Sequence, residues 1–170
     1  MAEPHLVLNA LEPRQAADVL RRACGAERWV AGMLERRPFA STAELLASAS
    51  EEWQRATEPE YLEAFSQHPQ IGEDLPALRE RFGSTLDFTS REQAGVKGSS
   101  EETLLALRDM NVAYRRRFGF IFIICATGKT AAQMLEALRQ RLDNERHAEL
   151  AIAAAEQAKI TRLRLEGLAA

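Results

Sequence analysis

Residues 41–53 read STAELLASASEEW, and this stretch decides the fold class. Its first four residues match a capping box, in which a Ser side chain and a Glu three positions later satisfy the free N–H groups of a helix start. The apolar residues that follow recur at helical spacing and form one face. They are Leu45, Leu46, Ala49 and Trp53. The pattern predicts an amphipathic helix that begins just after Ser41.

Similar start and stop signals divide the rest of the chain into helical segments. Capping boxes recur at residues 57–60 and 99–102, and glycine or proline follows most of the apolar-periodic runs. No segment sustains the alternation of a strand. The expected helices are a first one capped by Asn9 with Pro13 near its start, then residues 26–36, 42–53, 58–67, 74–81, 100–114, 130–142 and 144–168. We therefore expect an all-α, single-domain bundle of about eight helices over residues 1–170.

Two segments break the helical rhythm. Residues 72–98 contain four glycines and a proline, which predicts an irregular segment suited to an active site. Residues 120–124 (FIFII) form a short apolar run, and its period leaves buried strand and buried extended backbone equally open.

Composition and charge exclude several function classes. Lys and Arg total 22 and Asp and Glu total 25, so the formal charge of −3 gives no footprint for nucleic acid. The longest apolar run, residues 120–126, is too short to cross a bilayer, and the start does not resemble a signal peptide. Cys24 and Cys125 have apolar neighbours and no CxxC spacing, which predicts free buried thiols and fits a reducing cytoplasm.

The sequence does not favour a metal, a nucleotide or a serine-hydrolase site. The histidines His5, His68 and His147 are scattered, and no HExxH or GxSxG motif occurs. Gly128-Lys129-Thr130 resembles the end of a P-loop, but residue 123 is Ile where that motif needs glycine. We interpret this segment as a loop that ends in a Thr N-cap.

Three places carry residues suited to chemistry. His68 follows an amphipathic helix and precedes Pro69, a combination that presents a side chain rigidly. Residues 89–95 (TSREQAG) bring hydroxyl, carboxylate and carboxamide groups together, although a capped helix start explains the same pattern. Arg164 lies between two leucines, where it either faces inward to meet an anion or snorkels to the surface.

Motifs along nearly the whole chain resemble those of one enzyme family, the 2-oxo-4-hydroxy-4-carboxy-5-ureidoimidazoline (OHCU) decarboxylases. Residues 68–73 (HPQIGE) are similar to the family's HPxIG(D/E) signature, and residues 92–95 (EQAG) to its glutamate motif. Residues 111–123 resemble the family's stretch built around Phe-Gly-Phe, and residues 141–165 its C-terminal pattern. Ile121 and Gln70 depart from the pattern, which usually has proline and often has arginine there.

The resemblance implies an all-helical carboxy-lyase that needs no cofactor or metal, acts on OHCU to make (S)-allantoin in urate breakdown, and in most members is a homodimer. It also implies that His68 and Glu92 form the catalytic pair. The implied substrate contacts are Pro69, Thr89 or Ser90, Gln93, the segment Phe120, Ile121, Phe122 and Ile123, and Arg164.

From these residues we hypothesise that His68 transfers a proton and that Arg164 holds the anionic substrate. Glu92 either orients His68 or disfavours the substrate carboxylate by charge repulsion, and the residues leave both roles open. Two other functions compete. One is a lyase or hydrolase that acts on another ureido or imidazole anion, and the other is a helical binding module in which His68 and Glu92 are a structural pair. A helical DNA-binding regulator would need a basic face that the sequence lacks.

Overall fold

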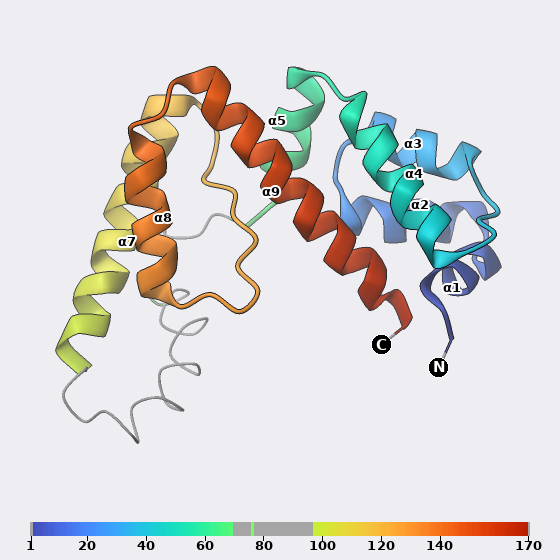
Figure 1. Cartoon of the computed structure of the whole chain (residues 1–170), viewed down its shortest axis with the longest axis horizontal. Helices are drawn as coiled ribbons and strands as arrows, with labels where there is room; N and C mark the ends of the chain where they lie inside the picture. The colour runs from blue at the N-terminus through green and yellow to red at the C-terminus, as the bar shows by residue number, and fades with distance from the viewer. Residues whose placement is uncertain (1, 70–75, 77–96, 170) are drawn as a thin grey trace. The chain divides into compact units, whose positions relative to one another are not determined.

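The computed structural model describes residues 2–69, 76 and 97–169. Within them the chain forms eight α-helices and no β-strand, which confirms the all-α prediction (Figure 1). The contacts divide the chain into two compact units. Unit 1 comprises residues 1–68 and 154–170, and unit 2 comprises residues 69–153. A single domain over residues 1–170 stays a prediction.

Unit 1 holds five complete helices, the C-terminal part of a sixth and a short 3-10 turn. These are α1 (Pro4–Ala10), α2 (Pro13–Ala23), α3 (Glu27–Glu35), α4 (Thr42–Gln54), α5 (Glu58–Ser66), the end of α9 (Arg146–Glu166) and η1 (Gly167–Ala169). The start of α4 confirms the opening prediction, because Ser41 Oγ accepts the backbone N–H of Glu44 at 3.1 Å. A capping box on Thr57 opens α5, also as predicted.

The expected role of Asn9 is wrong. Asn9 lies inside α1, and Glu12 is the N-cap of α2, where its backbone N–H bonds to the side chain of Gln15 at 3.3 Å. The Asn9 amide instead brackets the backbone of Phe39, donating to its carbonyl at 2.8 Å and accepting from its N–H at 3.0 Å. The Asn9 side chain therefore bonds to a residue 30 positions away instead of capping a helix next to it.

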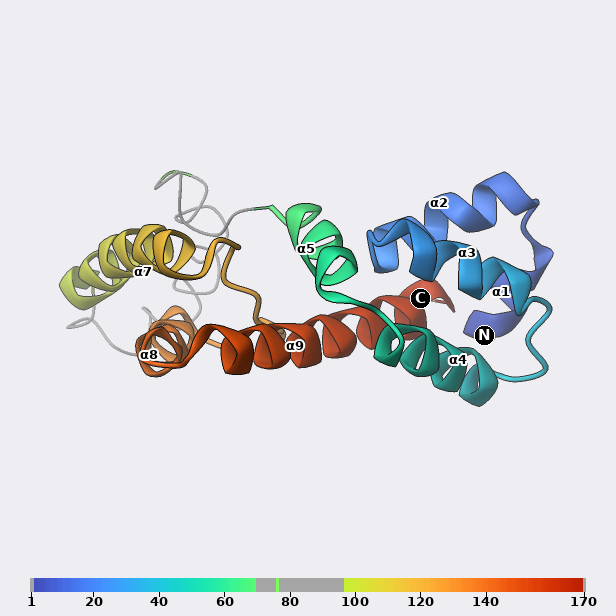
Figure 2. The same cartoon turned by 90° about the horizontal axis from the view of Figure 1, so that it is seen from above.

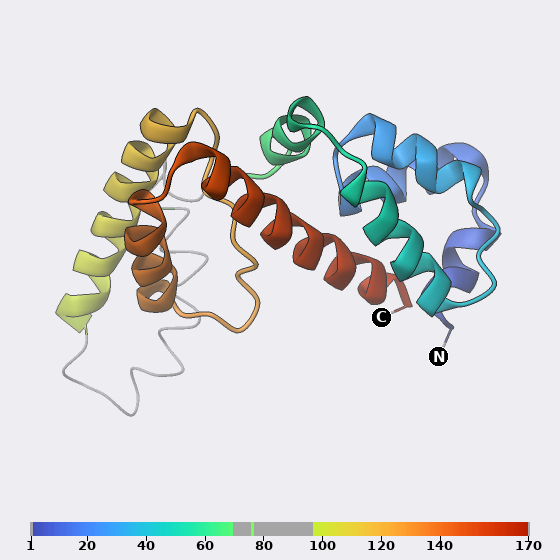
Figure 3. The same ribbon diagram turned by 45° about the horizontal axis from the view of Figure 1, so that its top comes forward.

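Two tryptophans tie the core of unit 1 together. The indole of Trp29 is buried and donates to the carbonyl of Ala49 on α4 at 3.0 Å. The indole of Trp53 donates to the carbonyl of Ala154 at 2.9 Å, which holds α4 against α9 (Figure 3). Both bonds satisfy a buried donor that an apolar core would otherwise leave unpaired.

Unit 2 contains α7 (Lys97–Phe118), α8 (Ala131–Leu142) and the first turns of α9. Helices α7 and α8 pack side by side (Figure 2). Helix α7 begins at Lys97, three residues before the predicted start at residue 100, so the capping box predicted at residues 99–102 is wrong and Ser99 lies inside the helix. Gly119 follows it with φ of 81°, a conformation that glycine adopts without strain. The predicted helix over residues 74–81 lies, apart from residue 76, outside the described residues.

The apolar run after α7 is irregular backbone, neither helix nor strand, so the buried strand is the alternative that the structure rules out. Phe120, Phe122 and Ile123 are buried within it. Thr130 then caps α8, accepting the N–H of Gln133 at 3.2 Å, which confirms the interpretation of the Gly-Lys-Thr segment. Among the described residues, no helix has the length and hydropathy needed to span a membrane.

Candidate functional site

The sequence-predicted site residues fall into three groups. His68 and Arg164 lie in unit 1, where they line the same pocket. Residues 120–123 lie in unit 2. Pro69 is exposed next to His68. The four remaining candidates, Thr89, Ser90, Glu92 and Gln93, lie outside the described residues.

The end of α5 positions His68. The helix stops at Ser66, and the backbone N–H of His68 still bonds to the carbonyl of Phe65 at 3.1 Å, so the residue is anchored to the last helical turn. Pro69 then fixes the direction in which the chain leaves. The imidazole is half-buried, and its Nε2 lies 2.5 Å from the Oε1 of Gln157 on α9.

The pocket beside His68 is open, with a volume of about 560 Å³. That volume falls in the range typical of small-molecule sites. Three of its lining residues are arginines. Arg21 is paired with Asp18 and with Glu27, so Arg22 and Arg164 supply the positive charge that suits an anion. It is lined by Asp18, Arg21, Arg22, Gly25, Ala64, Gln67, His68 and Arg164.

Arg164 is exposed, as the surface alternative expected, and it meets no carboxylate among the described residues. Its Nη1 donates to the backbone carbonyl of Arg22 at 2.8 Å and lies 3.5 Å from that of Ala23. These carbonyls belong to the last turn of α2, where the helix dipole favours a cation. Among the described residues, Nε and Nη2 of Arg164 have no acceptor, which leaves part of the guanidinium fork for an anion in the pocket.

The surroundings of His68 favour its neutral form. Burial lowers its pKa below the ordinary value, the positive charge of Arg164 acts in the same direction, and the hydrogen bond to Gln157 opposes them. A neutral imidazole can accept a proton, which a protonated one cannot.

Two of the unit 2 residues that the sequence assigned to substrate contact, Phe122 and Ile123, are in contact with Arg141. Phe120, Phe122 and Ile123 are buried, whereas Ile121 is partly exposed. Nη1 of Arg141 donates to the carbonyl of Ile123 at 2.7 Å, and the guanidinium lies 4.5 Å from the centre of the Phe122 ring. This combination of a hydrogen bond and a cation–π contact holds the segment in place at Phe122 and Ile123.

Glu149, with no exposed surface, neutralises Arg141. It accepts Nε of Arg141 at 2.6 Å and Nδ2 of Asn144 at 2.9 Å, and it also accepts the hydroxyl of Tyr114. Burial and the bond to Glu149 raise the pKa of Tyr114, so its hydroxyl stays a donor. The network therefore satisfies a buried ion pair on every side, which is the condition under which such a pair is tolerated.

Comparison with known proteins identifies the family. A family model described as OHCU decarboxylase matches residues 9–166. This chain belongs to the OHCU decarboxylase family. It is similar to a crystal structure of OHCU decarboxylase in the presence of (S)-allantoin, with 37% identity, a TM-score of 0.69, and coverage of 87% of this chain and 94% of the other. The sequence prediction of the family is confirmed.

Two relatives extend the comparison of this OHCU decarboxylase family member. It is 39% identical over 153 residues to the uric acid degradation bifunctional protein TTL of Arabidopsis thaliana, covering 89% of this chain. It is 27% identical over 164 residues to the 2-oxo-4-hydroxy-4-carboxy-5-ureidoimidazoline decarboxylase of Halalkalicoccus jeotgali, covering 95% of this chain and 89% of the relative. The chain spans less than half of the bifunctional Arabidopsis protein, 46% of its length.

Sequence reasoning missed two polar residues behind His68. Gln157 has no exposed surface and Thr161 is 6% exposed. Both occupy the buried stripe of α9 that continues to Leu165, at intervals of one helical turn. The sequence signal for them is a Gln and a Thr at the helical spacing of the buried face, because a buried amide or hydroxyl requires a hydrogen-bond partner.

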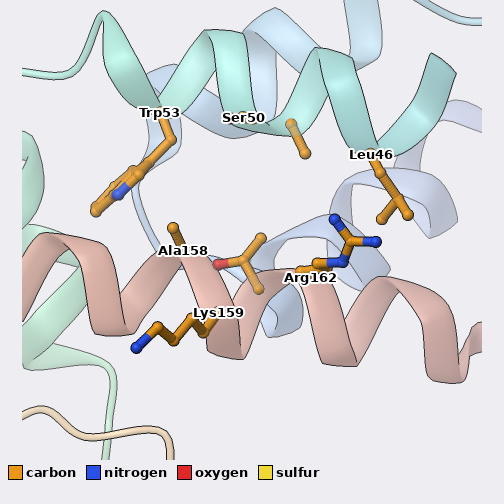
Figure 4. Close-up of a pocket in the computed structure, with 8 residues that line it drawn as sticks. Leu46, Ser50, Trp53, Ala158, Lys159 and Arg162 are labelled. Carbon is orange, nitrogen blue, oxygen red and sulfur yellow. The ribbon is translucent and has the colours of Figure 1, made fainter. Parts of the chain in front are cut away.

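The second pocket, the metal-ligand residue types and the cysteines offer less support for a functional site. A smaller pocket of about 200 Å³ lies between α4 and α9, with Leu46, Ser50 and Trp53 facing Ala158 and Arg162 (Figure 4). It contains none of the predicted site residues. Among the described residues, no three His, Cys, Asp or Glu side chains cluster in a way that would hold a metal ion. Cys24 and Cys125 are buried and form no disulfide, as predicted, and burial raises the pKa of Cys24 to about 11.

Proposed function

We propose that this protein decarboxylates OHCU to (S)-allantoin in urate degradation, without a cofactor or metal, and that His68 and Glu92 are its catalytic pair. Membership of a carboxy-lyase family supports the reaction class. The observation that carries the proposal is the pocket in which a half-buried His68 and the guanidinium of Arg164 lie together. That pocket offers a proton acceptor and an anion-binding group on the same wall.

The substrate itself supplies the electron sink. Loss of CO₂ breaks a carbon–carbon bond and leaves its electron pair on the ring carbon. The adjacent C=N bond accepts this pair, which gives an enol-like intermediate. A proton is then added to one face of that intermediate, and this step sets the single configuration of (S)-allantoin.

The proposed roles follow from this sequence of steps. Arg164 holds the substrate carboxylate with the N–H groups that α2 does not use. His68 transfers the proton, because a neutral imidazole works as acid or base near neutral pH. Glu92 orients His68 or disfavours the substrate carboxylate by charge repulsion, and Gln93 reads the ureido group as donor and acceptor.

The remaining contacts belong to the same proposal and rest on the family resemblance. They are Pro69, Thr89 or Ser90, and the segment Phe120, Ile121, Phe122 and Ile123. The bond from Arg141 to the carbonyl of Ile123 supports a fixed backbone in that segment.

The test is to mix purified protein with freshly generated OHCU and follow circular dichroism. OHCU decays alone to racemic allantoin, so a rapid optically active signal reports the enzyme. We expect His68→Ala to lower the rate by at least ~100-fold. His147→Ala, at an exposed helix position, is the matched control and should keep the wild-type rate.

The outcomes separate the competing functions. Only the slow racemic background from wild-type protein would reject OHCU as substrate. In that case turnover of another ureido or imidazole anion that depends on His68 would point to a related lyase or hydrolase. Loss of stability in His68→Ala, with no substrate turned over by wild type, would point to a binding module.

We further propose that the chain works as a cytoplasmic homodimer and folds as one domain. The family resemblance supports the dimer. Light scattering coupled to size exclusion should give twice the mass of 19.0 kDa, and a single-chain mass would reject the dimer. Treatment with a chelator should leave the rate unchanged.

A further inference from the structure

Behind His68, a chain of hydrogen bonds runs from its ring to the backbone of α2. Nε2 of His68 lies 2.5 Å from Oε1 of Gln157. Nε2 of Gln157 donates to Oγ1 of Thr161 at 3.1 Å, and that hydroxyl donates to the carbonyl of Ala23 at 3.3 Å. All these groups belong to unit 1, and Gln157 has no exposed surface.

The last acceptor in this series of hydrogen bonds, the carbonyl of Ala23, determines which group donates and which accepts at each step. A backbone carbonyl only accepts hydrogen bonds, so the hydroxyl of Thr161 is the donor in its bond to Ala23. The thiol of Cys24 also bonds to this hydroxyl, and whether the thiol donates or accepts, the single proton of Thr161 points away from Gln157. Thr161 is then an acceptor toward Gln157, and the amide nitrogen of Gln157 must face it. The amide oxygen consequently faces His68, and an oxygen there only accepts.

The ring nitrogen that meets this oxygen must therefore carry hydrogen. We propose that Gln157 is a positioning residue that holds neutral His68 as its Nε2–H tautomer and leaves Nδ1 as the nitrogen that exchanges a proton with the substrate. Among the described residues, Nδ1 has no hydrogen-bond partner, and His68 itself lines the pocket. The part of the proposal that concerns substrate rests on the proposed function, with Glu92 in the second of its two roles there, the repulsion of the substrate carboxylate, because both ring nitrogens of His68 are then in use. The part that concerns the tautomer does not rest on the proposed function.

A neutral amide suits this role better than a carboxylate. A carboxylate would also orient the ring, but it would stabilise the imidazolium and hold the proton on His68. The amide fixes which nitrogen bears hydrogen and adds no charge. The charged groups that line the same pocket remain Asp18, Arg21 and Arg22 on α2 and Arg164 on α9.

The tautomer can be measured without substrate. Long-range ¹H–¹⁵N correlation spectra of protein labelled with ¹⁵N-histidine distinguish Nε2–H from Nδ1–H. Only three histidines contribute, and exposed His147 gives the pattern of an unconstrained ring in the same spectrum. We expect His68 at neutral pH to be entirely the Nε2–H tautomer, and Gln157→Met to add a population of Nδ1–H.

A matched control exists on α4. Gln54 is exposed, and its amide donates to the hydroxyl of Ser50, one turn away, at 3.3 Å. Gln54→Met should leave the His68 spectrum unchanged. An Nδ1–H tautomer in the wild type, or equal tautomer populations in wild type and Gln157→Met, would overturn the proposal.

Kinetics separate positioning from a purely structural role. Gln157→Met should lower kcat by about tenfold or more, up to the ~100-fold expected when His68 is lost, with little change in KM. Gln157→Glu restores the acceptor, so it should keep the Nε2–H tautomer. Its negative charge should raise the pKa of His68 and shift the acid limb of the kcat profile to higher pH. A Gln157→Glu profile identical to that of the wild type would count against direct contact with His68.

The two proposals fail differently. If OHCU gives only racemic product while the spectra show the Nε2–H tautomer and its dependence on Gln157, the proposed function is wrong and the positioning role stands. If (S)-allantoin forms rapidly while the tautomer is Nδ1–H, the reaction stands and the positioning role is wrong.

Discussion

Helix α9 places a fully buried polar residue in each unit, Glu149 in unit 2 and Gln157 in unit 1, and the two organise their surroundings differently. Glu149 is the centre of an ion pair with Arg141, which in turn holds the carbonyl of Ile123. Gln157 is the middle of a neutral chain that ends at the carbonyl of Ala23. Both networks end on backbone, but only the neutral one holds a histidine ring, whereas the charged one holds the phenol of Tyr114 as a donor.

The difference teaches what each kind of network can do. A buried charge pair fixes backbone firmly, because removing one partner leaves the other charge buried with neither hydration nor a counter-charge. A neutral chain orients its histidine while leaving the charge of that ring free to change. The charged network therefore suits a structural support, and the neutral network suits a proton-transfer site.

The largest effect is expected on breaking the charged network. Glu149→Ala leaves Arg141 buried without a counter-charge, so the free energy of unfolding should fall by about 3–5 kcal/mol. Urea denaturation measures this loss. Glu136→Ala, at an exposed position of α8, is the control and should change stability by no more than about 0.5 kcal/mol. Similar losses in the two variants would mean that the buried pair contributes nothing particular.

Breaking the neutral network should cost less. Thr161→Val keeps the shape of the side chain but removes the acceptor for the amide of Gln157, which should lower the free energy of unfolding by about 1–3 kcal/mol. The same denaturation experiment applies. Ser50→Ala removes the exposed partner of Gln54 and should be nearly neutral. A loss as large as that of Glu149→Ala would erase the proposed contrast between the networks.

The charge beside His68 gives a smaller, directional effect. Arg164 lowers the pKa of His68, so Arg164→Met should raise it. Less acid is then needed to protonate the ring, and its NMR titration midpoint should move to higher pH. Arg162→Met, on the same helix and paired with Glu166, is the control. A midpoint that stays in place or moves to lower pH would contradict the assigned electrostatic contact.

The smallest expected difference concerns the two units themselves. Both tryptophans, Trp29 and Trp53, lie in unit 1, so their fluorescence reports that unit, whereas far-UV circular dichroism reports helices of both. Because α9 runs through both units without a break, we expect the two unfolding curves to coincide. Separate midpoints would reject a single cooperative domain.

The sequence predicted most of the helices because their starts are local. Ser41, Thr57 and Thr130 each act as an N-cap, and their partners lie within a few residues of them in the chain. Asn9 shows the limit of this reasoning, since its amide was drawn into a contact with Phe39 across 30 residues. Capping rules consider only the hydrogen-bond partners that lie close in sequence. Tertiary packing decides whether the side chain instead bonds to a partner far away in the sequence.

Two residues of the candidate pocket were found from the sequence, but the residues that support them were not. His68 and Arg164 stood out through their neighbours in the sequence, and they line one pocket. Gln157 did not stand out, because a glutamine in a long helix is ordinary when its burial is unknown. The partner of Arg164 was also unexpected, since it is the end of α2 rather than an acidic side chain.

By itself, the sequence determined the all-α class, the helix starts at Ser41, Thr57 and Thr130, and the family, because caps, apolar spacing and the order of motifs are all properties of neighbouring residues. Only the tertiary structure decided which polar groups face each other inside each unit. It placed Gln157 between His68 and Thr161, and Glu149 against Arg141. Buried polar groups must find partners wherever the fold brings them, and residues 89 positions apart carry no local signal of that meeting.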